Sequence, residues 1–247
     1  MTIDNDNDLQ NLLRIGQICG LTLQHMLAHV EPGMTTGQLD AIGAAFLKQH
    51  GARSAPILAY NYPGHTCISL NDEVAHGIPG TRVIQPGDII NVDVSAELEG
   101  YWADTGASAV VPPTTAAHER LCAFTRKALD NALDAARAGR PVNVIGKAVE
   151  AVAQVGGYRV IRALTGHGVG RHIHEKPSVF NFDNPRDHAQ LTEGLVITIE
   201  PFLSLGEGRV YTDRDGWTLR TMDGSVAAQY EHTVIITGDQ PILVTAV

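Results

Sequence analysis

Five side chains able to bind divalent metal ions are spread over the chain, each in a segment rich in β-branched residues or beside a glycine-rich turn. They are Asp93, Asp104, His167, Glu200 and Glu231. Four carboxylates and one imidazole suit a pair of divalent cations better than a single structural zinc ion. Because a carboxylate-bridged metal pair activates water, this set predicts a hydrolase with a dinuclear metal site.

Each of these residues also has a plainer interpretation. A carboxylate is usually an exposed or ion-paired surface group, and a single His167 would be read as a hydrogen-bonded core or loop histidine. Asp93, Glu200 and Glu231, however, lie in or beside runs of Val, Ile and Thr that are typical of buried strands. A buried carboxylate without a counter-charge is strongly destabilising. A bound metal is therefore the expected compensation, and these neighbours favour His167 as a further ligand.

The local sequence indicates how the backbone brings the ligands together. Asp93 and Asp104 flank Glu99-Gly100, which fits a hairpin turn, so two paired strands would place both carboxylates on one face. His167 lies in the segment GHGVG, where glycines allow another backbone to approach closely. Glu200 is followed by a proline, which ends strand pairing just after the ligand. The elements around the ligands are therefore predicted to be strands and tight turns.

Two helix pairs are predicted outside these strands. Apolar residues from Leu9 to Val30 recur with helical spacing and stop before a Pro-Gly pair. Thr35 or Thr36 can cap a second helix that ends at Gly51. The same pattern returns over residues 116–138 and continues in a shorter helix that ends at Gly156-Gly157.

The glycines that end these predicted helices recur at a nearly fixed spacing along the chain. Gly33 and Gly139 are 106 positions apart (139 − 33), and so are Gly51 and Gly157 (157 − 51). The strand-like segments 87–93 and 194–200, which end in a carboxylate ligand, repeat at an offset of 107 (194 − 87). Repetition at a fixed offset indicates a duplicated half.

The expected fold class is therefore α+β, with a central antiparallel sheet flanked by helices. A chain of 247 residues can bury a full core, and we expect one catalytic domain over residues 1–247. Its pseudo-symmetric halves would span about residues 1–110 and 111–247.

Composition narrows the partners and the compartment. The net charge of −9, with no basic stripe, argues against a nucleic-acid partner. Cys19, Cys67 and Cys122 lie far apart and form no CxxC pair, so neither a disulfide framework nor a zinc knuckle is predicted. The acidic start MTIDNDNDLQ and the absence of a membrane-length apolar run predict a cytoplasmic protein without a membrane segment.

Six segments in order along the chain carry a family resemblance. They are CISLNDEVAHGIP, NVDV, WADT, GHGVGRHIHEKP, ITIEP and QYEHT. With these segments the chain resembles the type I methionine aminopeptidases of the M24 peptidase family, which have a pita-bread fold shared with aminopeptidase P and prolidase. The resemblance covers nearly the whole chain and implies removal of an N-terminal methionine when the second residue is small.

The resemblance also implies a role for each ligand. Asp93 is similar to the bidentate ligand of one ion, Asp104 and Glu231 to bridging carboxylates, and His167 and Glu200 to the ligands that complete the other ion. Two divalent ions are implied, and the ligand set accepts Co, Mn, Fe or Zn. A water between the ions would be the nucleophile, and Glu200 would take and relay its proton.

Two further histidines match the non-ligand histidines of the family. His174 would donate to the scissile carbonyl oxygen and to the oxyanion that forms from it, while His76 would contact the peptide nitrogen. Without the resemblance, His76 would be read as an ordinary turn residue. His172 is expected to be exposed or to lie behind the site.

The methionine pocket is where the sequence departs from the better-known family pattern. Tyr62, Cys67 and Trp217 match residues that line this pocket with aromatic and soft surface. Ala59 stands where bacterial members often have an aromatic residue, and Ile173 where they often have Phe. A less strict selection of methionine is expected.

Other members of the superfamily are weighed by chain length. Type II enzymes carry a long insertion between the segments matching His174 and Glu200, where this chain has 25 residues (200 − 174 − 1). Aminopeptidase P and prolidase bring an extra N-terminal domain, for which 247 residues leave no room. The alternatives that stay open are a pita-bread aminopeptidase of altered first-residue preference, similar to aminopeptidase P, and a non-catalytic peptide-binding pita-bread protein. The latter class usually loses metal ligands, whereas this chain retains the full set.

The expected partners follow from the same resemblance. The substrate would be the N-terminus of a peptide or nascent protein, with transient contact to the ribosome. A monomer is expected, because family members of this size are often monomers.

Overall fold

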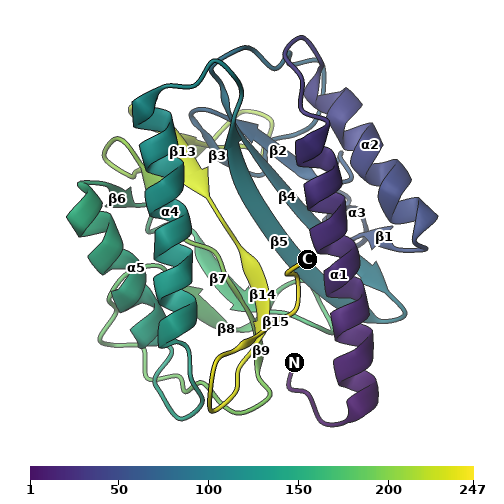
Figure 1. Ribbon diagram of the computed structural model, residues 1–247, viewed down its shortest axis with the longest axis vertical. Coiled ribbons are helices and arrows are strands. Elements are labelled where there is room, and N and C mark those ends of the chain that lie inside the picture. The colour runs from purple at the N-terminus through teal and green to yellow at the C-terminus, as the bar shows by residue number, and fades with distance from the viewer.

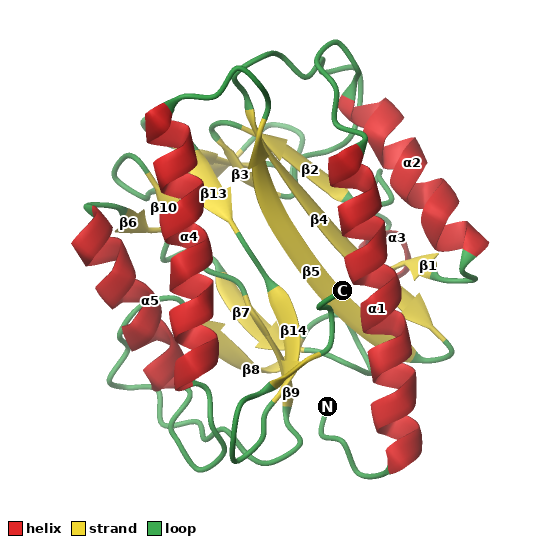
Figure 2. Cartoon of the chain, in the orientation of Figure 1, coloured by secondary structure: helices red, strands yellow, loops and turns green.

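The computed structural model describes residues 1–247, and its helices fall into two pairs that lie on the same face of the strands (Figures 1 and 2). The first pair is α1 (Asp6–Ala28) and α2 (Thr36–Gln49), and the second is α4 (Ala116–Ala135) and α5 (Asn143–Gly156). A short helix, α3 (Ala55–Tyr60), lies between them in the sequence. The four long helices match the predicted ones to within a few residues at each end.

The boundaries of the helices follow from local chemistry. Thr35, rather than Thr36, caps α2, and its hydroxyl and the Gln38 side chain form a reciprocal capping box. Gly51 follows α2 with a φ of 73°, a left-handed conformation that favours glycine. Helix α3 was not predicted, although Ser54 caps it and a proline stands in its first turn. Six residues are too few to show helical periodicity.

The strands form two larger sheets and two small ones. The first larger sheet has the order β1-β4-β2 with β5 on β4, and the second has the order β15-β14-β9-β7-β8. Every strand pair is antiparallel, as predicted. The strands are β1 (Arg53–Ser54), β2 (Cys67–Leu70), β3 (Glu73–Ala75), β4 (Ile89–Leu98), β5 (Tyr101–Val110), β6 (Arg159–Val160), β7 (Thr165–Gly168), β8 (Glu175–Phe180), β9 (Val196–Ile199), β10 (Phe202–Ser204), β11 (Val210–Thr212), β12 (Leu219–Thr221), β13 (Ala227–Gln229), β14 (His232–Ile235) and β15 (Ile242–Leu243).

The two larger sheets meet along β5 and the start of β14. The amide of Glu231 donates to the carbonyl of Gly106 at 2.8 Å. The hydroxyl of Thr233 accepts from the amide of Asp104 at 3.0 Å and donates to the carbonyl of the same residue at 2.7 Å. This seam places the predicted ligand Asp104, on β5, beside the predicted ligand Glu231, the residue before β14.

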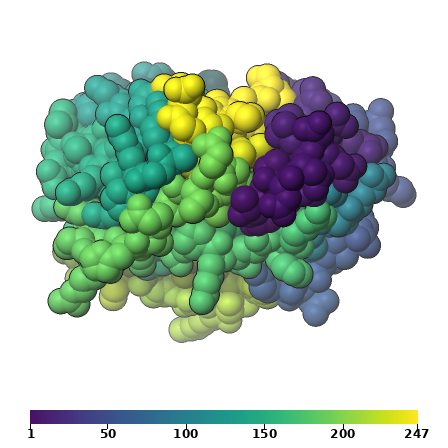
Figure 3. Space-filling view, turned by 90° about the horizontal axis from the view of Figure 1, so that it is seen from below, coloured from purple at the N-terminus to yellow at the C-terminus, as the bar shows by residue number.

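The core lies between the helices and the strands. Leu12, Ile15 and Met26 of α1 are fully buried, and each such side chain stabilises the fold by about 1.5–3 kcal/mol. Gly16 and Gly20 let α1 approach the C-terminal segment, because a Cβ on Gly16 would lie 2.3 Å from Val244. Figure 3 shows the N-terminal and C-terminal residues side by side on one face. No helix combines the length and the hydropathy needed to cross a bilayer.

The element order also repeats, since a helix pair precedes β7–β9 much as α1 and α2 precede β4 and β5. The division into one domain of two halves near residue 110 stays a prediction.

Candidate metal centre and substrate cavity

A cavity of about 480 Å³ opens where the two larger sheets meet, and it contains residues from both predicted halves. Four of the five predicted ligands line it, and they come from β4, β5, β7 and the residue after β9. The lining residues are Pro56, Tyr60, Tyr62, Cys67, Ala75, His76, Asp93, Ser95, Asp104, Ala163, Leu164, Thr165, His167, Ile173, His174, Glu175, Ser178, Glu200, Phe202 and Trp217.

Three of the predicted ligands form a compact buried group. One ligand atom each from Asp104, His167 and Glu231 lies within 4.8 Å of the other two. The Nε2 of His167 is 3.8 Å from an Oδ of Asp104 and 3.4 Å from an Oε of Glu200. Glu200 therefore borders the group, although it is not part of the compact set.

Asp93 joins the cavity from the neighbouring strand. The hairpin turn at Glu99-Gly100 is present, with φ values of 53° and 83°, and it pairs β4 with β5. Asp93 lies opposite Gly106, while Asp104 lies opposite Ser95, so the two carboxylates are diagonal neighbours on one face of the sheet. The predicted convergence of the two residues is thus present in the structure.

The electrostatics of the cluster fit a bound cation. Burial raises the pKa of Asp93 to about 6. Burial, together with the charge of neighbouring carboxylates, raises the pKa values of Asp104, Glu200 and Glu231 well above their ordinary range. Oδ1 of Asp104 and Oε1 of Glu231 are buried without any hydrogen-bond partner. Buried carboxylate oxygens that lack a proton donor are the groups that a hard cation satisfies.

Neighbouring polar groups orient the predicted ligands. Nδ1 of His167 lies 3.0 Å from the carbonyl of Gly168, so Nδ1 carries the proton and Nε2 is left to bind a metal. The side-chain amide of Gln229 donates to Glu231 at 2.9 Å, and the hydroxyl of Thr198 donates to Glu200 at 2.8 Å. Sequence reasoning missed these two orienting residues. Thr198 had a detectable signal, since it lies two positions before Glu200 and so on the same face of the strand.

The glycines on either side of His167 allow the backbones of neighbouring strands to approach closely, as predicted. A Cβ on Gly166 would lie 2.5 Å from the carbonyl oxygen of Thr198, and one on Gly168 would lie 2.2 Å from that of Lys176. Any side chain at either position would push β7 away from a neighbouring strand. The segment that carries His167 can therefore lie between β8 and β9 only with glycine at these two positions.

The three further histidines lie in different places. His76 and His174 line the cavity, whereas His172 lies outside it. Burial lowers the pKa values of His76 and His174, which keeps both rings neutral near pH 7. His76 has a φ of 55°, and strained backbone of this kind is common at functional sites.

The predicted pocket residues are placed with one exception. Tyr62, Cys67, Ile173 and Trp217 line the cavity, and the rings of Tyr62 and Trp217 meet edge to face at 5.2 Å. Ala59 is exposed on α3 and does not line the cavity. The structure places the next residue, Tyr60, in the cavity, because it ends the unpredicted helix α3. A substrate-binding role for Ala59 stays a prediction.

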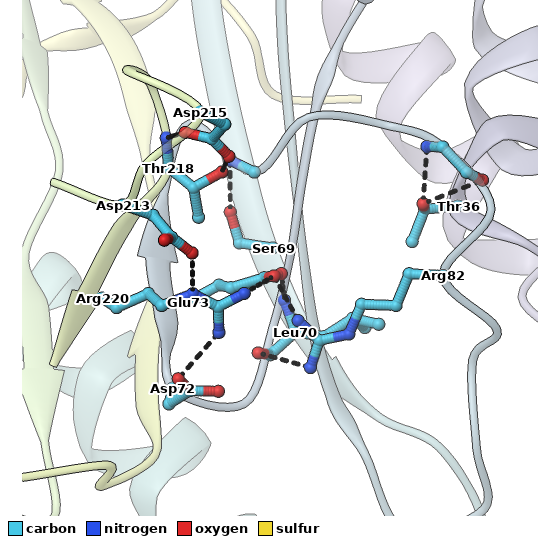
Figure 4. A network of polar contacts seen from close by, with 12 residues as sticks. Thr36, Ser69, Leu70, Asp72, Glu73, Arg82, Asp213, Asp215, Thr218 and Arg220 are labelled. Carbon is cyan, nitrogen blue, oxygen red and sulfur yellow. Dashed lines mark hydrogen bonds and ion pairs between the residues drawn. The ribbon is translucent and has the colours of Figure 1, made fainter.

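Figure 4 shows a polar network centred on Arg220 and Glu73. The network supports the wall of the cavity that carries His76 and Trp217. The guanidinium of Arg220, on β12, binds Asp72 at 2.8 Å, Glu73 at 2.8 Å and Asp213 at 2.6 Å. Glu73 also accepts an ion pair from Arg82 and a hydrogen bond from the amide of Leu70. The network joins β3, which leads into His76, to the loop that presents Trp217.

Backbone contacts fix the same wall. The hydroxyl of Tyr62 donates to the carbonyl of Gly77 at 2.7 Å, and Ser69 accepts from the amide of Gly77 at 3.1 Å. Asp215 accepts from the amides of Trp217 and Thr218, both at 2.8 Å. The aromatic wall is thus held by hydrogen bonds as well as by packing.

Comparison with known proteins identifies the class that this fold and site define. The profile of metallopeptidase family M24 matches residues 10–238, and the chain belongs to this family. It is 45% identical over 247 residues to Methionine aminopeptidase 2 of Bacillus subtilis (strain 168), with 99% of each chain covered. Crystal structures of methionine aminopeptidases from Thermotoga maritima and Rickettsia prowazekii match all of both chains at a TM-score of 0.95, with 31% and 34% identity. The predicted α+β pita-bread fold is confirmed.

Proposed function

We propose that this chain is a methionine aminopeptidase that removes the N-terminal methionine of peptides and nascent proteins when the second residue is small. The observation that carries the proposal is the buried carboxylate cluster, with its unpartnered oxygens, at one end of a cavity walled by Tyr62, Cys67 and Trp217. Soft and aromatic groups of this kind suit an unbranched thioether side chain. Full-length identity of 45% to a methionine aminopeptidase supports it.

The cluster would hold two divalent ions, which are Mn, Fe, Co or Zn. Asp93, Asp104, His167, Glu200 and Glu231 would hold these ions. Such ions supply Lewis acidity and bring the pKa of a bound water towards neutrality.

The side chains of the protein perform the remaining steps. Glu200 takes the proton of the attacking water and passes it to the departing amine, for which its raised pKa suits it. His174 donates a hydrogen bond to the scissile carbonyl oxygen and stabilises the oxyanion. His76 contacts the nitrogen of the peptide bond. A cytoplasmic location, transient ribosome contact and a monomeric state stay predictions.

The test uses purified protein loaded with Mn²⁺, Co²⁺ or Fe²⁺ and a peptide panel that varies only the first two residues. We expect cleavage of Met-Ala and Met-Gly peptides over Met-Leu and Met-Lys peptides, loss of activity in chelator and recovery on adding metal. Asp104→Asn and Glu231→Gln should lose nearly all activity and bound metal, as measured by elemental analysis. Asp130→Asn, on the exposed face of α4, is the matched control.

Two results would overturn the proposal. The first is full activity in protein that elemental analysis shows to be free of divalent metal. The second is a strong preference for X-Pro peptides over Met-Ala peptides, which would favour an activity similar to that of aminopeptidase P.

A further inference from the structure

Tyr60, which sequence reasoning did not single out, contacts the imidazole of His174. Its hydroxyl is hydrogen-bonded to Nδ1 of that ring, and the two ring centroids are 5.6 Å apart. No other hydrogen bond reaches the His174 ring, so Nε2 is left for a substrate in the cavity. His174 stands beside His167, with ring centroids 4.2 Å apart.

The chemistry of the two groups decides the direction of this hydrogen bond. Burial, and after it the charge of Asp104, raises the pKa of Tyr60, so its hydroxyl stays protonated. A neutral imidazole has one protonated nitrogen and one bare nitrogen, and the bare one can only accept. A phenol is a stronger acid than a neutral imidazole N–H, and a bare imidazole nitrogen is a stronger acceptor than a phenol oxygen. Tyr60 is therefore the donor and Nδ1 the acceptor, which leaves the proton on Nε2.

We propose that Tyr60 is a positioning residue that holds His174 in the tautomer and orientation in which its Nε2–H donates to the scissile carbonyl oxygen. The inference rests on the proposed function, in which His174 stabilises the oxyanion. In the opposite tautomer, Nε2 would present a lone pair to a developing negative charge and would repel it. In the same way, the aspartate of a Ser-His-Asp triad holds the catalytic histidine in one tautomer and orientation.

The backbone places Tyr60 for this role. It is the last residue of α3, and Asn61 follows it with a left-handed φ of 53°. The amide of Asn61 donates to the carbonyl of Ile57 at 3.0 Å, and that of Tyr62 donates to the carbonyl of Pro56 at 3.3 Å. This tight helix end brings both tyrosines to the cavity, one against His174 and the other against Trp217.

The experiment is a double-mutant cycle of Tyr60→Phe and His174→Ala in metal-loaded protein, assayed on a Met-Ala peptide. Tyr60→Phe removes the hydroxyl and keeps the ring. We expect kcat to fall about 3- to 10-fold, the usual effect of losing one neutral hydrogen bond, with KM and metal content unchanged. In the His174→Ala background, Tyr60→Phe should cause no further loss. Tyr211→Phe is the control, because Tyr211 on β11 is about as exposed as Tyr60, 47% against 44%, and lies outside the cavity.

A second measurement reads the tautomer directly. In zinc-loaded protein with ¹⁵N-labelled histidine, two-bond ¹H–¹⁵N correlations distinguish an Nε2–H ring from an Nδ1–H ring. The His174 signals are assigned by their absence from His174→Ala. We expect the Nε2–H tautomer in the unsubstituted protein and a mixture of tautomers in Tyr60→Phe.

The outcomes separate this inference from the proposed function. If Tyr60→Phe is silent, lowers kcat by the same factor in the His174→Ala background or leaves the His174 tautomer unchanged, the inference is wrong while the aminopeptidase assignment stands. If His174→Ala itself keeps full activity, the role proposed for His174 is wrong, and this inference with it.

Discussion

The buried carboxylates should make the metal-free protein less stable at neutral pH than in mild acid, and Asp93 allows the size of the effect to be worked out. Burial raises its pKa from 3.8 to about 6. In this range the folded state binds more protons than the unfolded state, so stability falls as pH rises. The loss develops between about pH 4 and pH 6, and it is complete above the folded-state pKa. Two pKa units correspond to about 3 kcal/mol from this residue alone.

Asp93→Asn removes the charge at nearly constant volume, and the new amide can donate to Asp104. In chelator-stripped protein at pH 8, we expect the substitution to raise the free energy of unfolding by about 2 to 3 kcal/mol. For a protein of this size the midpoint of thermal unfolding should rise by roughly 5–10 °C. At pH 4 the two proteins should differ by only about 0.5 kcal/mol, because Asp93 is then protonated in the folded state and already partly protonated in the unfolded state.

The assay is urea and thermal unfolding at pH 4 and pH 8, with and without Mn²⁺. Metal should reverse the order of stability at pH 8, because bound ions stabilise the folded state and the substitution removes one of their ligands. Asp130→Asn, at an exposed aspartate, should leave both curves in place. The reasoning is refuted if stripped Asp93→Asn is no more stable than the unsubstituted protein at pH 8.

Three further predictions concern the walls of the cavity. Arg220→Met should lower the free energy of unfolding by about 2 kcal/mol in urea titrations, because it leaves the buried Glu73 with one cationic partner fewer. The control, Arg209→Met at an exposed ion pair, should lower it by about 0.5 kcal/mol or less. His172→Ala should keep kcat and KM within about 2-fold, since the ring is exposed and outside the cavity. A fall in kcat of about 100-fold, which is typical of losing an oxyanion donor, would contradict this placement. Norleucine-Ala peptides should have a kcat/KM within about 10-fold of that of Met-Ala peptides. Ile173 offers only apolar contact, and such contacts distinguish similar side chains by about 1–3 kcal/mol. Complete rejection of norleucine would contradict this prediction.

The convergence of the proposed ligands was predictable because sequence signals act over a few residues around each of them. Asp93 and Asp104 flank the dipeptide Glu99-Gly100, which is recognisable in the sequence as a hairpin turn. The alternation of side chains along the paired strands then places both carboxylates on one face of the sheet. Glycines around His167 and the proline after Glu200 restrict the backbone locally. The helical spacing of apolar residues located the two helix pairs.

The walls of the cavity could not be predicted in the same way. Ala59 was assigned to the pocket by its position in the sequence. Helix α3 has only six residues and therefore no periodic signal, and it places Tyr60 in the cavity in the position expected for Ala59. The contact between Tyr60 and His174 spans 114 positions, and the ion pairs of Arg220 with Asp72 and Glu73 span 148 and 147. Nothing local in the sequence distinguishes these side chains from solvated surface groups.

The placement of the ligands on a seam explains how a destabilising cluster can be kept in the protein. Asp104 lies on β5 and Glu231 just before β14, yet hydrogen bonds across the seam already hold the two segments together. These bonds are made by backbone groups and by the hydroxyls of Thr105 and Thr233. The carboxylates are therefore brought together by these bonds and not by the ions. Because these bonds do not depend on metal, the repulsion among the carboxylates persists in the stripped protein instead of being relieved by the sheets moving apart. That persistent repulsion is an energy that bound cations release, so the rigidity of the seam contributes to metal affinity.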